Sequence, residues 1–205
     1  MNSIIKGQAN PAPTYGRGQL ALFTAILVLA MALTFSCSSG NDDGGSSSSS
    51  GGGASCGKLM SQNLNVDAAG SVCYDNDPVN CSKYGRLYDW ATAMKLPAKC
   101  NETLSTEDPD CAIQSKHKGI CPSGQHIPSI EELSEYGSGC LKNQLGGSGN
   151  SGGYFRNAGS DGRWWSASEY SGSYAYSRYM GYGSEYANWD NYYKSYLYSV
   201  RCVQD

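Results

Sequence analysis

Apolar residues recur at helical spacing in residues 83–97. They follow the pattern i, i+3, i+4 and i+7, which is typical of one buried face of a helix. The residues on this face are Leu87, Trp90, Ala91 and Met94. Pro97 ends the pattern because proline cannot continue a helix. We therefore expect a first helix in this segment, followed by a long polar loop over residues 98–121 that cysteines close.

A second helix is predicted after Ser129. Ser129 and Glu132 have the spacing of a capping box, in which each side chain binds the other residue's backbone N–H. Ile130 and Leu133 then face the core, and Gly137 is expected to end the helix.

Three short strands are predicted after a glycine-rich loop over residues 146–162, because residues of high strand propensity alternate there between turn residues. The strands cover residues 163–169, 173–183 and 192–203. Side chains alternate between the two faces of a strand. In the second strand this places Tyr174, Tyr176, Arg178 and Met180 on one face and Ala175, Ser177 and Tyr179 on the other.

The last predicted strand has one face expected to be buried. That face carries Tyr196, Tyr198, Val200 and Cys202. Residues 184–193, which overlap the first two residues of this strand, are expected to form a hairpin loop. Tyr186, Trp189 and Tyr192 in this loop have no periodic reason to be buried.

The N-terminal segment is typical of an export signal. An uncharged apolar run of 14 residues, Leu20 to Leu33, follows Lys6 and Arg17. The run is short for a membrane-spanning helix, which needs about twenty residues. Its end resembles a lipobox, the sequence at which bacterial lipoproteins are cleaved and acylated on cysteine, although Thr34 stands where leucine is usual. The alternative is ordinary secretory cleavage near Ser36.

The number of cysteines favours a lipid on Cys37. The chain has 9 cysteines, so removing Cys37 leaves an even set of eight that can all form disulfides. We therefore expect a lipoprotein signal peptide over residues 1–36, a Ser/Gly-rich tether over 37–55 and a domain over 56–205. The protein should be exported and lipid-anchored to the outer membrane or cell surface of a bacterium.

Composition predicts that aromatic side chains supply much of the core. Residues 56–205 contain only 19 Leu, Ile, Val and Phe residues, but 15 tyrosines and 4 tryptophans. Aromatic side chains bury enough area to replace the missing aliphatic ones. The same residues include 13 Lys and Arg against 16 Asp and Glu. This charge argues against a nucleic-acid partner, which would need a basic surface.

Four segments together resemble the Fibrobacter succinogenes major paralogous domain, a family of secreted or lipid-anchored bacterial domains. They are QNLNVDAAGSVCYDNDPVNCSKYGRLYDWATAM, KGICPSGQHIPSIEEL, WWSASE and YSVRCVQD, in this order between residues 60 and 205. One departure is visible at Gln125, where the family usually has tryptophan before His126. We expect the packing around this corner to change.

The resemblance implies an α+β, C-type-lectin-like fold, with two helices, a small antiparallel sheet and the two ends of the domain together. It also implies disulfides between Cys73 and Cys81 and between Cys121 and Cys202. The other four cysteines allow three connectivities, and Cys100 with Cys111 and Cys56 with Cys140 is the one we expect.

Metal and catalytic sites are not predicted. The segment Asn188–Asn191 has the residue types of a lectin calcium site in the wrong order, and calcium needs six to eight oxygens. His126 is expected to bond to backbone, and Glu131, Glu132 and Glu135 are explained by the start of a helix. No metal or cofactor is therefore expected.

Two functions remain. The first is a non-catalytic binding or adhesion domain for a polysaccharide or a surface partner, with Tyr186, Trp189, Tyr192, Tyr193 and Glu169 as candidate ligand contacts. The second is a structural envelope lipoprotein with no dedicated ligand. An enzyme acting on glycans is a more distant third.

Overall fold

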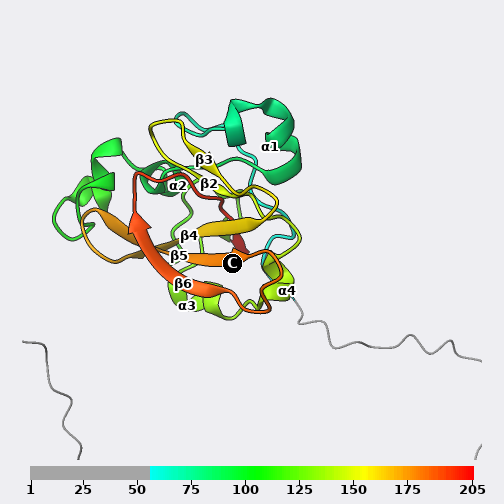
Figure 1. Ribbon diagram of the computed structural model, residues 1–205. Helices are drawn as coiled ribbons and strands as arrows, with labels where there is room; N and C mark the ends of the chain where they lie inside the picture. Colours follow the sequence, from blue (N-terminus) through cyan, green and yellow to red (C-terminus); the bar gives the residue numbers. More distant parts are fainter. Residues whose placement is uncertain (1–55) are drawn as a thin grey trace, which may run out of the picture. The chain divides into compact units, whose positions relative to one another are not determined.

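The computed structural model describes residues 56–205. The predicted signal peptide, the lipid site at Cys37 and the tether over residues 37–55 lie outside the described residues. The described part has an α+β fold of short helices, small antiparallel sheets and long connecting loops (Figure 1). None of its helices is both long and apolar enough to cross a membrane.

The α-helices are α1 (Pro78–Tyr84), α2 (Trp90–Met94), α3 (Ile130–Ser134) and α4 (Ser138–Leu141), and the 3-10 helices are η1 (Tyr74–Asn76), η2 (Ala98–Asn101) and η3 (Pro109–Cys111). The strands are β1 (Gln125–His126), β2 (Ser148–Gly149), β3 (Phe155–Arg156), β4 (Asp161–Glu169), β5 (Tyr174–Gly181), β6 (Asn188–Tyr193) and β7 (Val203–Gln204). β4, β5 and β6 form the main antiparallel sheet in that order, whereas β1 pairs with β7 and β2 with β3.

The main sheet separates two clusters of buried side chains. Trp164 and Trp165 are consecutive in β4, so they point to opposite faces. Trp165 packs in one cluster with Trp90 and Tyr198, and Trp164 packs in the other with Leu133, all of them buried. The indole N–H of Trp165 donates to the Tyr88 carbonyl at 2.9 Å and that of Trp164 to Asn63 Oδ1 at 2.7 Å. Aromatic residues thus supply much of the core, as composition predicts.

The first predicted helix is wrong in its extent, because the segment holds two short helices. α1 ends at Tyr84, and Gly85 follows with φ +77°, outside the helical region. The backbone then pairs with other segments, since Leu87 N–H donates to the Val72 carbonyl at 2.9 Å. α2 begins only at Trp90. The predicted apolar face is nevertheless buried, because periodicity reports burial more directly than helical hydrogen bonding.

The second helix begins as predicted, with a complete capping box between Ser129 and Glu132. Its predicted end at Gly137 is wrong. α3 stops at Ser134, and Gly137 is the N-cap of α4, a helix that the sequence pattern does not indicate. The loop predicted over residues 98–121 also contains η2 and η3.

The last predicted strand is wrong as well. Regular pairing in β6 ends at Tyr193, and residues 194–202 pair with other segments only through isolated bridges such as Tyr88 with Tyr198. Both sides of this segment are buried, including Lys194 and Arg201. The segment runs through the interior, so alternating residues do not form one solvent-exposed face and one buried face.

Four disulfides link the described part of the chain. They join Cys56 to Cys140, Cys73 to Cys81, Cys100 to Cys111 and Cys121 to Cys202. These are the pairs expected from the resemblance and from the remaining connectivity. Cys121–Cys202 lies beside the β1–β7 pair, and Leu59 bridges to Val203. The two ends of the domain therefore lie together.

His126 has carboxylate partners, so the expectation that it bonds to backbone is wrong. Its ring is buried, with Nδ1 at 2.7 Å from Asp205 Oδ1 and Nε2 at 3.0 Å from Glu132 Oε1. The neighbouring Gln125 has a buried side-chain oxygen without a hydrogen-bond partner in the described part of the chain. The corner is thus built around a buried histidine held by carboxylates.

The stability of the domain should depend on pH in the acid range, because of Glu132. Burial alone would raise the pKa of Glu132, but hydrogen bonds from the Ser129 N–H and His126 outweigh burial and hold this pKa below its usual value. A depressed folded-state pKa stabilises the fold above the unfolded pKa, and this stabilisation is lost as pH falls through the folded-state pKa. We expect Glu132→Gln to be less stable than the wild type at pH 7, and the difference to shrink below about pH 4.3.

Urea denaturation at several pH values measures this difference in unfolding free energy. Glu131→Gln is the matched control, because Glu131 is exposed on the same helix. A Glu132→Gln deficit that stays constant down to pH 3 would contradict the assignment.

Candidate binding surface

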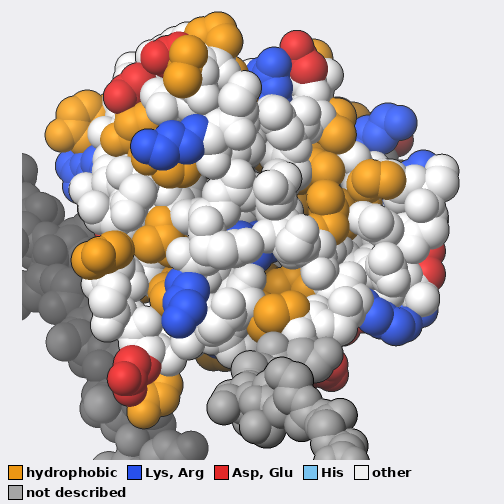
Figure 2. Space-filling model, turned by 90° about the vertical axis from the view of Figure 1, so that its right-hand side faces the viewer, with side chains coloured by type: hydrophobic (Ala, Val, Ile, Leu, Met, Phe, Trp, Pro, Cys, Tyr) orange, Lys and Arg blue, Asp and Glu red, His pale blue; other side chains and the backbone are white. Residues whose placement is uncertain are grey.

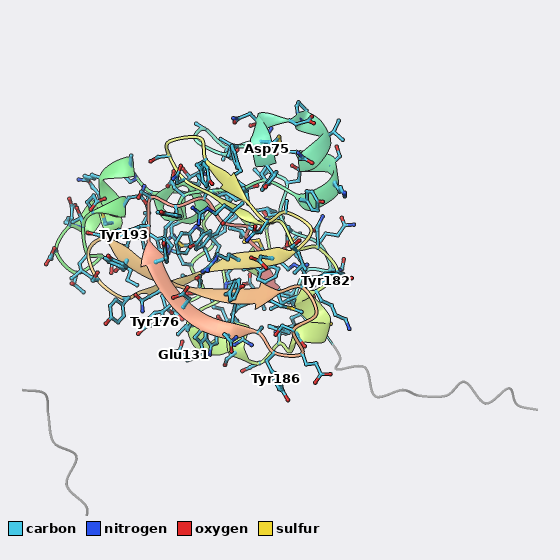
Figure 3. All side chains as sticks on the ribbon, viewed as in Figure 1. Asp75, Glu131, Tyr176, Tyr182, Tyr186 and Tyr193 are labelled. Carbon is cyan, nitrogen blue, oxygen red and sulfur yellow. A yellow bond between two sulfur atoms is a disulfide. The ribbon has the colours of Figure 1, made fainter. Side chains whose placement is uncertain are left out.

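The candidate residues near the C-terminus lie in and before a strand. Residues 188–193 form β6, so the expectation of a loop over 184–193 is wrong for most of its length. β6 is the edge strand of the main sheet, and it pairs with β5 on one side. Tyr186 precedes the strand and is 73% exposed. Figure 3 shows Tyr186 near the start of β6 and Tyr193 near its end.

Strand register divides the predicted row of aromatic residues between the two faces of the sheet. Trp189, Asn191 and Tyr193 alternate with Asn188, Asp190 and Tyr192 along β6. Trp189 and Tyr193 therefore share one face, whereas Tyr192 points to the other. The rings of Tyr192 and Tyr193 nevertheless meet edge to face at 5.9 Å at the end of the strand, so Tyr193 borders both faces.

The β5 residues opposite Trp189 and Tyr193 complete an aromatic surface. Arg178 pairs with Trp189, Tyr176 with Asn191 and Tyr174 with Tyr193. We call these six side chains the aromatic face. Alternation predicts the common face of the β5 members, but only the register with β6 shows what lies beside them.

Contacts within the aromatic face hold its rings in place. The rings of Tyr174 and Tyr193 lie 4.4 Å apart, and the Arg178 guanidinium lies 4.2 Å from the Trp189 ring centroid. Tyr170 contacts Tyr176 edge to face at 5.5 Å. Such ring pairs add roughly 0.5–1.5 kcal/mol to the area that they bury.

Part of the aromatic face is open to solvent. Trp189 is 40% and Tyr193 46% exposed, and Tyr174 and Tyr176 are half-buried. The other end of the same sheet face is covered, because Trp164 and Met180 pack against Leu133. The aromatic face is therefore the part of the sheet that the helices leave uncovered.

Arg178 is buried below this surface without a carboxylate partner in the described residues. Its guanidinium donates to the Tyr136 carbonyl at 3.3 Å, and Nε has no hydrogen-bond partner within residues 56–205. Burial lowers the pKa of Arg178. Its main contact is the ring of Trp189, so Arg178 supports the exposed indole from beneath.

Glu169, the fifth candidate, is engaged inside the protein. Its carboxylate lies 2.6 Å from Lys194 Nζ, and its second oxygen accepts from Ser105 N–H at 3.0 Å. The side chain is 9% exposed. It lies at the wall of a cavity of about 530 Å³ with both oxygens already bonded.

Charge does not mark a patch on the face that Figure 2 shows. Figure 2 shows one face of the molecule, on which acidic and basic side chains are scattered among polar ones. Within residues 56–205, no group of three or more histidine, cysteine, aspartate or glutamate side chains could hold a metal ion. No family model, curated protein or solved structure matches this chain.

Proposed function

We propose that residues 56–205 form a non-catalytic binding module whose aromatic face binds a polysaccharide. The observation that carries the proposal is the set of exposed rings on the open face of an edge strand. Tyr193 lies four positions after Trp189 in β6, which is a distance of about 13 Å along the strand. Two aromatic rings at this spacing can each stack against a sugar ring of the same polysaccharide chain. Exposed aromatic patches also commonly mark interaction sites.

The proposal includes display at a bacterial surface through a lipid on Cys37 and a C-type-lectin-like fold. The lipobox-like sequence and the Ser/Gly-rich tether support the first part. The pairing of β1 with β7 and the Cys121–Cys202 disulfide support the second, because they bring the two ends of the domain together.

Bonding of the acidic side chains supports a binding role over a catalytic one. Glu132 and Glu169 lie at the same cavity, but each is engaged by protein groups, Glu132 by His126 and Glu169 by Lys194. The eight cysteines of the described domain form disulfides. Enzymes of related fold that use a reactive cysteine need a free thiol, and these eight supply none.

We expect Trp189→Ala with Tyr193→Ala to lower retention of the domain on an insoluble polysaccharide at least tenfold. Aromatic anchors at the centre of a binding surface cost about 2 kcal/mol or more when truncated. The measurement is pull-down on cellulose and chitin, followed by a glycan array. Tyr182→Ala is the control, because Tyr182 is 81% exposed and lies outside the aromatic face.

Two outcomes would overturn the proposal. Retention of the double variant at the wild-type level would place binding elsewhere on the domain. Failure of the wild type to bind any glycan would favour the structural lipoprotein instead.

A further inference from the structure

A second, more enclosed site lies on the opposite face of the main sheet. The β2–β3 hairpin and the start of β4 border a polar cleft of about 320 Å³. This volume is at the small end of the range for ligand pockets. The cleft is lined by Tyr154, Arg156, Arg163, Tyr192, Tyr196 and Tyr198, among others.

Arg163 forms a rigid wall of this cleft. Its guanidinium lies 4.4 Å from the ring centroid of Tyr179 and 5.5 Å from that of Tyr198. Nη1 donates to Asp190 Oδ2 at 2.7 Å, and the side chain is 22% exposed. The arginine is thus fixed by tyrosine rings and a carboxylate while part of it still faces solvent.

The tyrosines of the cleft also hold one another. The rings of Tyr192 and Tyr196 meet edge to face at 4.5 Å, and the side-chain hydrogen bond between them stabilises the protonated Tyr192 hydroxyl and so raises the pKa of Tyr192. Tyr198 lies beneath them, with its ring 6.3 Å from that of Tyr192. Their rings and hydroxyls therefore form a preformed wall that is partly apolar and partly polar.

The rim of the cleft is exposed and carries both hydrogen-bond donors and acceptors. Tyr154 is 59% exposed, and the Arg156 guanidinium lies 4.9 Å from its ring. Arg156 has no ion-pair partner among residues 56–205. Asp161 also lines the cleft and accepts from Asn157 Nδ2 at 2.7 Å, which leaves Oδ1 without a protein donor in the described part of the chain.

These features select one class of ligand. Arg163 is paired with Asp190, so Arg156 and Asp161 set the charge that a ligand meets. An anion would be attracted by Arg156 but repelled by Asp161, and a cation would meet the reverse. A neutral sugar suits both, because each of its hydroxyls donates and accepts a hydrogen bond and one side of its ring can lie against an aromatic side chain. We propose that this cleft binds a neutral sugar unit, free or at the end or branch of a chain, separately from the aromatic face.

The proposal predicts saturable binding of at least one neutral sugar by residues 56–205 within the full chain. The measurement is protein-observed NMR or calorimetry with neutral mono- and disaccharides, each paired with its uronic acid, such as galactose with galacturonate. We expect Asp161→Asn and Tyr154→Ala each to weaken binding of the neutral sugar about tenfold. Tyr154 is exposed on a hairpin, so its variant should fold normally.

The single variant Trp189→Ala separates this site from the aromatic face. Trp189 contacts Arg178. The ring of Tyr193, by contrast, lies 5.9 Å from that of Tyr192 and 6.3 Å from that of Tyr196, which both line the cleft. The Trp189→Ala variant should bind the neutral sugar as the wild type does, even if it no longer binds insoluble polysaccharide.

The inference falls if no neutral sugar binds, if the uronic acid binds as well as its neutral partner, or if Asp161→Asn and Tyr154→Ala leave binding unchanged. It also falls if the aromatic-face variant abolishes binding of the small sugar.

Discussion

Glu169→Gln should destabilise the domain by about 3 kcal/mol, which is the lower end of the cost of breaking a buried ion pair. The substitution leaves the ammonium group of Lys194 without its carboxylate, and Lys194 is fully buried. The loss stays at the lower end because other groups continue to bind Nζ. The carbonyls of Cys100 and Thr103 both accept from it at 3.1 Å, and the ring of Trp90 lies 4.4 Å away.

A double-mutant cycle tests whether the ion pair itself is responsible. Lys194→Met should also be destabilising, because it leaves the carboxylate of Glu169 almost buried beside one backbone donor. The variant with both substitutions should lose less than the sum of the two single losses, because neither charge is then left without its partner. The unfolding free energy from urea denaturation, with disulfides intact, measures all three.

Glu107→Gln is the control for the loss of one negative charge, since Glu107 is exposed on the loop that carries Thr103 and Ser105. Surface substitutions of this kind usually change stability by no more than about 0.5 kcal/mol. Additive losses in the cycle, or a Glu169→Gln loss as small as that of the control, would contradict a stabilising buried pair. They would also return Glu169 to the candidates for ligand contact.

The difference between what the sequence predicts and what the structure contains follows from where each signal arises. The capping box at Ser129 is a local signal, because both of its hydrogen bonds lie within four residues. β4 and β5 are predicted because strand propensity and turns are also local. By contrast, β6 is an edge strand with residues partly exposed on both faces, so its polar sequence resembles a loop.

The candidate site could be predicted only in part for the same reason. The sequence places Trp189 and Tyr193 among candidate contacts, and it places Tyr174 and Tyr176 on a common face. It does not contain the register that joins these two pairs across β5 and β6. Lys194 and Arg201 were missed as buried residues because their partners, such as Glu169 and Asn63, lie far away in sequence.

Removing the Cys121–Cys202 disulfide should cost more stability than removing either of the two disulfides of short separation, Cys73–Cys81 or Cys100–Cys111. Cys121 and Cys202 are 81 residues apart, whereas Cys100 and Cys111 are separated by 11. The cost of closing a loop in the unfolded chain rises with its length, to roughly 4.5 kcal/mol for about 80 residues and roughly 3 kcal/mol for about 12. Replacing both cysteines by alanine removes this constraint.

The other disulfides do not shorten the loop that Cys121–Cys202 closes. Cys73–Cys81 and Cys100–Cys111 lie wholly before it in the chain, and Cys56–Cys140 has only one end inside it. The full separation of 81 residues therefore sets the entropic cost of closing this loop in the unfolded chain. Both sulfurs also belong to the buried cluster around Trp165, so alanine leaves some packing unfilled there.

The comparison is between Cys121→Ala with Cys202→Ala and Cys100→Ala with Cys111→Ala, by urea denaturation after mass mapping confirms the three remaining disulfides. We expect the first variant to lose at least about 1.5 kcal/mol more than the second. The second pair is also fully buried, so it controls for the loss of packing. Equal losses would show that local packing, and not the constraint on the unfolded chain, sets the contribution of these disulfides. A larger loss for the first pair would show that the long-range link between the β1 corner and the residue before β7 stabilises the fold more than the short Cys100–Cys111 link does.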